Sequence, residues 1–154
     1  MAVVIALPDE PAIEIEDLIL DFTGTLSAAG RLLPGVTERI AALAERLRIT
    51  VMTADTRGTA RQELAGLPVD VRMVGGGAEK AEMVRRLGPE HTAAIGNGRN
   101  DVEMVKLAAI GIAVLGEEGA AGALLREADV IAPDITAALD LLADPLRLVA
   151  TLRG

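Results

Sequence analysis

Short apolar runs rich in Val and Ile alternate along the chain with longer stretches whose apolar residues recur every three or four positions. The runs predict strands and the stretches predict amphipathic helices, because these are the periods of the two structures. Alternating strands and helices are typical of a parallel sheet that is covered on both faces. The pattern therefore predicts an α/β protein, a three-layer Rossmann-like fold with a central, mostly parallel sheet. We expect strands at 3–7, 12–16, 17–21, 49–53, 69–74, 92–95, 110–115 and 130–131, and helices at 34–47, 58–64, 78–87, 101–108, 120–127 and 135–152.

Turn residues refine this pattern at two points. The first two strands flank the turn Pro8-Asp9-Glu10-Pro11 and are predicted to form a short β-hairpin ahead of the main sheet. Pro34 is expected at the first position of the first helix, where its missing N–H costs nothing. No repeat or long linker interrupts the 154 residues, so we expect one domain over 1–154.

Composition excludes several classes of function. Hydrophobic residues make up 51% of the chain, but charges interrupt every apolar run before it reaches the length of a membrane span. The chain has no cysteine and no recognisable export signal, which favours the cytoplasm. A net charge of -8, one Phe and no Tyr or Trp argue against a nucleic-acid partner. We therefore expect no membrane and no nucleic acid among the partners.

Polar residues follow three of the predicted buried strands at the point where each strand ends. Asp21 follows one strand, Thr53 ends the next, and the segment 97–101 follows another. Ligands of open α/β sheets bind at this edge, so the three groups are expected to share one crevice. A carboxylate there can attack phosphorus while the N–H groups of a Gly-containing turn hold phosphoryl oxygens. Taken one by one, each segment also has a purely structural interpretation as a strand end or a left-handed turn.

Lys80 lies in the first turn of the predicted helix 78–87. A cation there is unfavourable with the helix dipole, so an anion is expected to hold it in place. A phosphoryl group and the Asp21 carboxylate would both do so, although a solvated surface lysine is the alternative.

Four segments together resemble the motifs of the haloacid dehalogenase-like (HAD) superfamily, in the family's order and over about residues 14–132. Within this superfamily the likeness is greatest to the capless, soluble P-type ATPase-like proteins. The intervals 27–50 and 54–79 are each too short for a substrate-selecting cap domain. The four segments are Asp21-Phe22-Thr23-Gly24-Thr25, then 49–55, then 75–82, and finally Gly96-Asn97-Gly98-Arg99-Asn100-Asp101 with Gly111-Ile112-Ala113 after it.

The resemblance implies a Mg²⁺ cofactor and a role for each matching residue. Asp21 would be the nucleophile and a metal ligand, and Lys80 would neutralise both the nucleophile and the transferring phosphate. The implied catalytic set is Asp21, Thr23, Thr53 and Lys80; the phosphate-binding set is Thr53, Ala54, Lys80 and Asn100; the metal-binding set is Asp21, the main-chain carbonyl of Thr23, Asn97 and Asp101, the last two directly or through water.

Two positions depart from the typical HAD pattern. Thr23 stands where most phosphatases of the family have an aspartate that acts as the general acid, and Asn97 stands where an aspartate ligand is usual. Loss of a general acid costs about 10²–10⁴ in rate. We therefore expect a slow Mg²⁺-dependent phosphohydrolase or phosphotransferase that works through an aspartyl phosphate. The alternative is a phosphate-binding or phosphorylatable regulatory or accessory module with little turnover.

The missing cap bears on the partners. An open site suits a phosphorylated small molecule or a macromolecule as the partner. Members of this form often use a neighbouring subunit as a lid, so the resemblance also implies a homo-oligomer.

Overall fold

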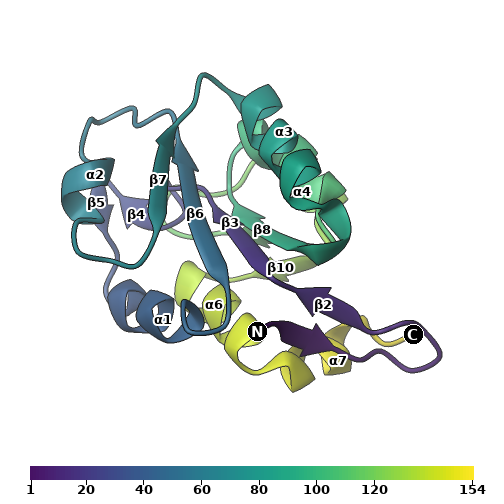
Figure 1. The fold of residues 1–154 in the computed structure, drawn as a ribbon. Helices are drawn as coiled ribbons and strands as arrows, with labels where there is room; N and C mark the ends of the chain where they lie inside the picture. The colour runs from purple at the N-terminus through teal and green to yellow at the C-terminus, as the bar shows by residue number, and fades with distance from the viewer.

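A six-stranded sheet forms the centre of the computed structural model, which describes residues 1–154 (Figure 1). The strand order is β10-β9-β8-β3-β6-β7, and every neighbouring pair is parallel. The predicted α/β fold is therefore confirmed. The sheet contains β3 (Asp17–Leu20), β6 (Arg48–Thr53), β7 (Asp70–Met73), β8 (Thr92–Gly96), β9 (Ile110–Val114) and β10 (Val130–Ala132).

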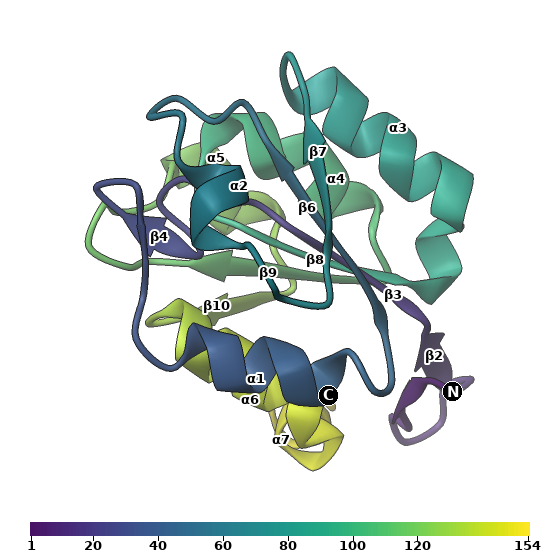
Figure 2. The ribbon, with the colours of Figure 1, turned by 60° about the vertical axis from the view of Figure 1, so that its left-hand side comes forward.

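Helices cover both faces of this sheet, as Figures 1 and 2 show. One face carries α3 (Gly77–Leu87), α4 (Val102–Leu107) and α5 (Gly122–Glu127), and the other carries α1 (Val36–Leu43), α6 (Ile135–Ala143) and α7 (Pro145–Leu152). Along β3, Leu18 and Leu20 enter the core on the α1 side, whereas Ile19 enters the core on the α3 side. A strand buried on both faces has no solvent-facing positions, which is why β3 reads as an unbroken apolar run after Asp17.

The predicted N-terminal hairpin is present but shorter than expected. It pairs β1 (Val3–Ile5) with β2 (Ile13–Ile15) in antiparallel register, apart from the main sheet. Helix α7 packs against β1, and the side chains of Val3, Ile5 and Ile15 are buried. The hairpin thus extends the core beyond the N-terminal end of β3.

The expected single helix over 135–152 is wrong, because the chain forms α6 and α7 instead. Asp144 separates them with φ −125° and ψ 83°, outside the helical region. Proline disfavours helical geometry in the residue before it and suits the first position of a new helix, so Pro145 ends one helix and begins the next. No helix of the chain is long and apolar enough to cross a membrane.

The segment between β3 and β6 also differs from expectation. Pro34 is not the first helical residue, because Gly35 caps α1 with a φ of 83° and the helix ends at Leu43. Leu47, expected on the same helix, lies in the following turn and is still buried. A small hairpin, β4 (Ser27–Ala28) with β5 (Arg31–Leu32), was not predicted, since two-residue strands carry no periodicity.

The remaining connections are short. Helix α2 (Ala60–Glu63) links β6 to β7 and is shorter than the predicted 58–64. Single 3₁₀ turns, η1 (Pro89–His91) and η2 (Arg99–Asp101), precede β8 and α4. The intervals 27–50 and 54–79 contain only short elements, and neither holds an inserted domain.

Candidate active site

A cavity of about 180 Å³ lies at the carboxyl ends of β3, β6 and β8. Six of the eight residues singled out in the sequence line it, from three separate segments of the chain. The other two, Lys80 and Asp101, are fully buried and contact each other, and Lys80 also contacts Asp21. The structure therefore brings all eight together at one edge of the sheet. The cavity is lined by Asp21, Thr23, Thr53, Ala54, Thr56, Asn97, Gly98 and Asn100.

A tight turn after β3 presents the Asp21 side chain. The N–H of Asp21 still pairs with the Ile95 carbonyl of β8, which fixes its main chain at the sheet edge. The Phe22 carbonyl then accepts hydrogen bonds from the N–H groups of residues 25, 26 and 27 at 3.0–3.2 Å. Gly24 has a φ of 77°, and the Asn97 amide occupies the space where a Cβ would lie. Only glycine fits there, which explains its place in the motif.

Lys80 lies between two carboxylates in the buried part of the site. Its Nζ donates to Asp21 Oδ1 at 2.7 Å and to Asp101 Oδ1 at 2.8 Å. The Lys80 side chain is 0% exposed, so water contributes nothing to its solvation. The predicted anion near the start of helix α3 is therefore present, and the surface-lysine alternative is wrong.

The charges of Asp21, Lys80 and Asp101 shift the pKa values of Asp21 and Lys80. Burial, and after it the nearby charge of Asp101, raise the pKa of Asp21 to about 6, although Lys80 and the Thr25 hydroxyl act to lower it. Burial alone would lower the pKa of Lys80, but the charges of Asp21 and Asp101 outweigh it and the pKa is raised. Two carboxylates against one ammonium leave a net charge of about -1 when both are ionised. Such a pocket favours an added cation.

Asp101 holds the surrounding loop in place with both of its oxygens. Oδ1 accepts from Lys80, and Oδ2 accepts from the N–H groups of Asn97 and Gly98 at 3.1 and 3.0 Å. Asp101 is also fully buried and does not line the cavity, so a metal bound in the cavity would not contact it directly. The geometry therefore favours a positioning role for Asp101, with any contact to a metal passing through water.

Helix α3 is held against the same loop by a close approach of two backbones. A Cβ on Gly77 would lie 2.6 Å from the main-chain oxygen of Asn100. A side chain at position 77 would push the start of α3 away from the loop. Because Lys80 is one turn further along this helix, Gly77 helps to set the distance between Lys80 and Asp101.

The Thr25 hydroxyl joins the side chains of Asp21 and Asn97. The Thr25 hydroxyl lies 3.0 Å from Asp21 Oδ2 and 3.1 Å from Asn97 Oδ1, but its single proton can serve only one of them at a time. Asn97 Nδ2 donates to the Gly119 carbonyl at 3.0 Å, which leaves Oδ1 facing the Thr25 hydroxyl. Hard oxygens in this arrangement suit Mg²⁺, which needs few protein ligands because it keeps several waters.

The ligand set is sparse. No group of three or more His, Cys, Asp or Glu side chains capable of holding a metal occurs in the chain. A cation here would therefore depend on Asp21, on the neutral amide oxygen of Asn97 and on a main-chain oxygen such as that of Thr23, which lines the same cavity.

Thr53 faces the cavity from the end of β6. Its Oγ1 accepts the N–H of Asp55 at 2.8 Å, so the hydroxyl proton remains free to donate. Asp55 has a φ of 50°, and its Oδ1 accepts the N–H groups of Thr59 and Ala60 at 3.0 Å each. These bonds fix the turn after β6, and the Thr53 side chain lines the cavity beside it.

Sequence reasoning assigned no role to Thr25, Thr56 or Gly119. Thr25 belongs to the first motif, and its spacing of four from Asp21 was the available signal. Thr56 lines the cavity from a loop that no periodicity describes. Gly119 acts through its carbonyl, 22 residues after Asn97, and nothing in the sequence indicates that contact.

Comparison with known proteins gives a family and several relatives. Residues 71–135 match the family model of the haloacid dehalogenase-like hydrolases. An uncharacterized protein of Methanocaldococcus jannaschii is 48% identical over 60 residues, which are 39% of this chain and 64% of that protein. A copper-transporting ATPase of Schizosaccharomyces pombe is 32% identical over 116 residues, 71% of this chain and 12% of the ATPase. The chain thus spans less than two thirds of each of these curated relatives.

Solved structures share the fold at low sequence identity. A 3-deoxy-D-manno-octulosonate 8-phosphate phosphatase from Moraxella catarrhalis, in complex with magnesium, phosphate and its sugar, superposes with a TM-score of 0.71 and 16% identity. The superposition covers 90% of this chain and 94% of the phosphatase. At this identity the likeness concerns the fold rather than the substrate.

Proposed function

We propose that the chain is a haloacid dehalogenase-like protein, as its fold and the family match over residues 71–135 support, and that it transfers phosphoryl groups through Asp21. One observation carries the proposal. The Asp21 carboxylate opens onto a small cavity on one side, and on the other it is held by a fully buried lysine. A buried carboxylate with a pKa near 6 is ionised at neutral pH and can act as a nucleophile.

The reaction has two steps. An oxygen of Asp21 attacks the phosphorus of a donor, and the bond from phosphorus to the leaving oxygen breaks with its electron pair. Water then attacks the aspartyl phosphate, which releases inorganic phosphate and restores the carboxylate. The Thr53 hydroxyl is placed to donate to a phosphoryl oxygen in both steps, as are N–H groups of the surrounding turns.

We assign Mg²⁺ to the oxygens of Asp21, Asn97 and the Thr23 main chain. When bound, the cation neutralises charge on the phosphoryl group and fixes its orientation. With Asp21 and Asp101 ionised and Lys80 protonated, the site carries about -1, and Mg²⁺ brings it to about +1. A dianionic phosphoryl group then enters a positive pocket.

Thr23 limits the leaving groups that the site can handle. It lines the cavity at the position of the family's general acid, but a hydroxyl does not exchange protons near neutral pH. Acyl phosphates, whose leaving groups need no protonation, should therefore phosphorylate Asp21, whereas ordinary phosphomonoesters should react slowly. The aspartyl phosphate should also persist, because no general base activates water.

A phosphorylatable regulatory or accessory module is the second candidate. The same Thr23 favours it, since a long-lived aspartyl phosphate is what such a module requires. The two candidates differ only in the lifetime of the adduct.

Incubation with Mg²⁺ and acetyl phosphate, followed by intact mass spectrometry, tests both. We expect one phosphoryl adduct that hydroxylamine removes and that the Asp21→Asn variant lacks. Release of inorganic phosphate is measured in parallel, because rapid hydrolysis would keep the adduct from accumulating. Absence of both the adduct and Asp21-dependent phosphate release would contradict the proposal.

Thr23→Asp tests the explanation for slow turnover. Restoring a carboxyl group should raise the hydrolysis of a phosphomonoester such as p-nitrophenyl phosphate by about 10²–10⁴-fold. Thr23→Asn is the matched control, since it has nearly the same shape and no titratable proton. Equal rates for the two variants would show that the missing acid is not what limits turnover.

A further inference from the structure

Strand β7 forms one edge of the sheet and has no partner on its outer side. It pairs only with β6, and the N–H of Val74 just beyond it donates to the Thr53 carbonyl. In a parallel strand, the N–H and C=O groups of one residue point to one neighbouring strand, and those of the next residue point to the opposite side. Because the N–H of Val74 points to β6, the main-chain groups of residues 70 and 72 do so too. The N–H and C=O groups of Val71 and Met73 therefore point outward. They form an open row to which another strand can bind.

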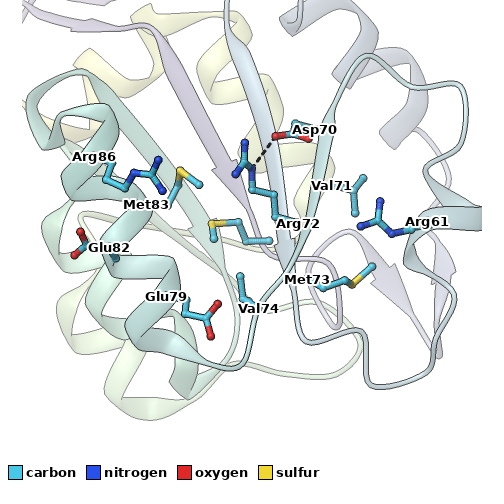
Figure 3. Close-up of a pocket in the computed structure, with 11 residues that line it drawn as sticks. Arg61, Asp70, Val71, Arg72, Met73, Val74, Glu79, Glu82, Met83 and Arg86 are labelled. Atoms are coloured by element: carbon cyan, nitrogen blue, oxygen red, sulfur yellow. Dashed lines mark hydrogen bonds and ion pairs between the residues drawn. The ribbon is translucent and has the colours of Figure 1, made fainter.

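The largest cavity of the molecule, about 530 Å³, runs along this edge (Figure 3). Its walls come from α3 on one face of β7 and from α2 on the other. Three of the five methionines of the chain line it, and methionine surfaces adapt readily to a partner. The lining residues are Met52, Arg61, Asp70, Val71, Arg72, Met73, Val74, Glu79, Glu82, Met83 and Arg86.

The charge of this groove differs from that of the whole chain. The groove contains three arginines and three carboxylates, so it is neutral, whereas the chain carries -8. Two copies of an acidic protein repel each other over most of their surfaces. They can approach at a neutral edge with the least repulsion.

We propose that the protein forms a homodimer in which the β7 strands of two copies pair in antiparallel fashion across a two-fold axis at Val71. In this register Val71 exchanges both main-chain hydrogen bonds with the partner's Val71. The two six-stranded sheets then join into one continuous sheet. Because the axis is perpendicular to the sheet, the α3 helices of both copies lie on the same face.

The side chains of β7 select this register. Asp70 and Arg72 flank Val71 and project on one face, where they form an ion pair of 2.8 Å within the strand. Both are about half exposed, and Arg72 uses only its Nε, so its other donors are free. A two-fold axis at Val71 places each Asp70 directly opposite the partner's Arg72. These are non-hydrogen-bonded pairs, in which facing side chains lie closest.

Other registers lose this complementarity. An axis at Arg72 would set the two Arg72 side chains against each other, and like charges in directly opposite positions are destabilising. An axis at Met73 would place Arg72 opposite the partner's Val74. The reciprocal charge pattern therefore identifies a second copy of the chain as the occupant, because an unrelated strand would have to reproduce the same spacing of charges.

The predicted dimer is weak. Strand β7 has only four residues, so the paired strands bury little surface, and small interfaces are typical of transient complexes. We expect a Kd of about 10–100 µM. Sedimentation velocity across a concentration series spanning this range is a direct measurement, and absorbance at 230 nm suits a chain without Trp or Tyr.

Charge variants test the register. Arg72→Asp gives each strand two carboxylates, and Asp70→Arg gives each strand two arginines. Each variant alone should raise the dimer Kd by about tenfold or more, because both cross-strand pairs become repulsive. An equimolar mixture of the two should associate again, since every carboxylate then faces an arginine. Arg126→Asp, an exposed site on α5 with the same change of charge, is the matched control and should dimerise like the unmodified chain.

Three results would overturn the proposal. The unmodified chain could remain monomeric throughout the series, which would leave the β7 edge to a strand of another protein. A dimer insensitive to both charge variants would have its interface elsewhere. Two variants that fail to associate when mixed, although each retains the circular dichroism spectrum of the unmodified chain, would exclude the register centred on Val71.

Discussion

The two ends of β3 each carry a buried aspartate, and the two residues have different surroundings. Asp17, before the apolar run, is 3% exposed, and Asp21, after it, is 4% exposed. Arg48 binds both oxygens of Asp17, at 2.8 and 2.7 Å, and extends its own side chain into solvent. Asp21 instead shares one buried lysine with Asp101.

The difference shows how the same residue type becomes either an anchor or a reactive group. The Asp17 carboxylate has a guanidinium in the bidentate geometry that both groups prefer. Glu16 also lies 3.8 Å from Arg48, but Glu16 and Arg48 are both largely exposed, so water screens the additional charge. The Asp21 cluster has one negative charge too many, and burial prevents water from compensating for it. The pKa of Asp21 is therefore raised, and the carboxylate gains from binding a cation or a phosphoryl group.

The largest expected difference is between variants that lack the Asp21 carboxylate and variants that lack the Asp17 carboxylate. Asp21→Asn should reduce phosphoryl transfer by about 10³-fold or more, as loss of a covalent nucleophile does, while the stability is kept or increased. Asp17→Asn should have the opposite profile, with phosphoryl transfer nearly unchanged and stability lowered by about 1–2 kcal/mol through the weakened ion pair. Phosphate release and urea unfolding, followed by circular dichroism, measure the two properties. Equal losses of activity would mean that Asp21 acts only through the fold.

Removing each cation is the second contrast. Lys80→Met leaves Asp21 and Asp101 buried without a counter-ion and should destabilise the fold by about 3–5 kcal/mol at neutral pH. Arg48→Met should cost much less, because the guanidinium lies largely in solvent and water can replace it. Thermal unfolding of both variants at pH 7 makes the comparison. Adding Asp21→Asn to Lys80→Met should restore part of the stability, and failure to do so would show that the loss comes from packing.

The third prediction concerns pH. Folded Asp21 keeps its proton up to about pH 6, whereas the unfolded residue loses it near 3.8, so the folded state binds more protons between these values. The resulting stabilisation is complete below about pH 3.8 and is lost as the pH rises through 6. Protons should also compete with Mg²⁺, weakening its binding about tenfold between pH 7 and pH 5. Calorimetric titration with Mg²⁺ at pH 5 and at pH 7, with Asp21→Asn as control, tests this competition. Equal Mg²⁺ affinities at the two pH values would contradict it.

Asn97→Asp has the smallest expected effect. A second carboxylate in the cavity should bind Mg²⁺ more tightly, but the new oxygen loses the hydrogen bond to Gly119 and faces its carbonyl. We therefore expect the Mg²⁺ affinity to improve by only about threefold to tenfold. A new carboxylate that lost no hydrogen bond would improve it more. Gln62→Glu, on the exposed side of α2, supplies the same charge away from the site. An equal gain in that variant would mean that residue 97 is not a ligand.

Periodicity and strand-end residues were sufficient to predict the sheet, its helices and the meeting of Asp21, Thr53 and the segment 97–101. The full set of eight site residues followed only from the resemblance to the HAD motifs. Periodicity also extended two helices too far. The apolar spacing of 135–152 continues across Pro145, so a rule based on spacing alone joined α6 and α7 although the proline marked the break. Leu47 was counted on α1 because a buried residue after a helix satisfies the same spacing as one on it.

The arrangement of hydrogen bonds inside the site could not be predicted. The sequence identifies Asn97 but not which atom of its amide faces the Thr25 hydroxyl, because that depends on a carbonyl from a distant loop. It identifies Asp101 as a candidate ligand, yet both of its oxygens are occupied by Lys80 and by two N–H groups. Such details arise from three-dimensional contacts between segments that share no local pattern.

The cavity at Asp21 has a volume of about 180 Å³, below the roughly 300–1,000 Å³ of pockets that enclose a whole small molecule. It can surround a phosphoryl group and little else, so the rest of any donor extends into solvent. In the proposed function, the residues that act on phosphorus would thus be physically separate from those that recognise the remainder of the donor. Mutations on the rim can change which molecules are accepted without touching the machinery around Asp21, which makes this chain a favourable starting point for selecting new specificities.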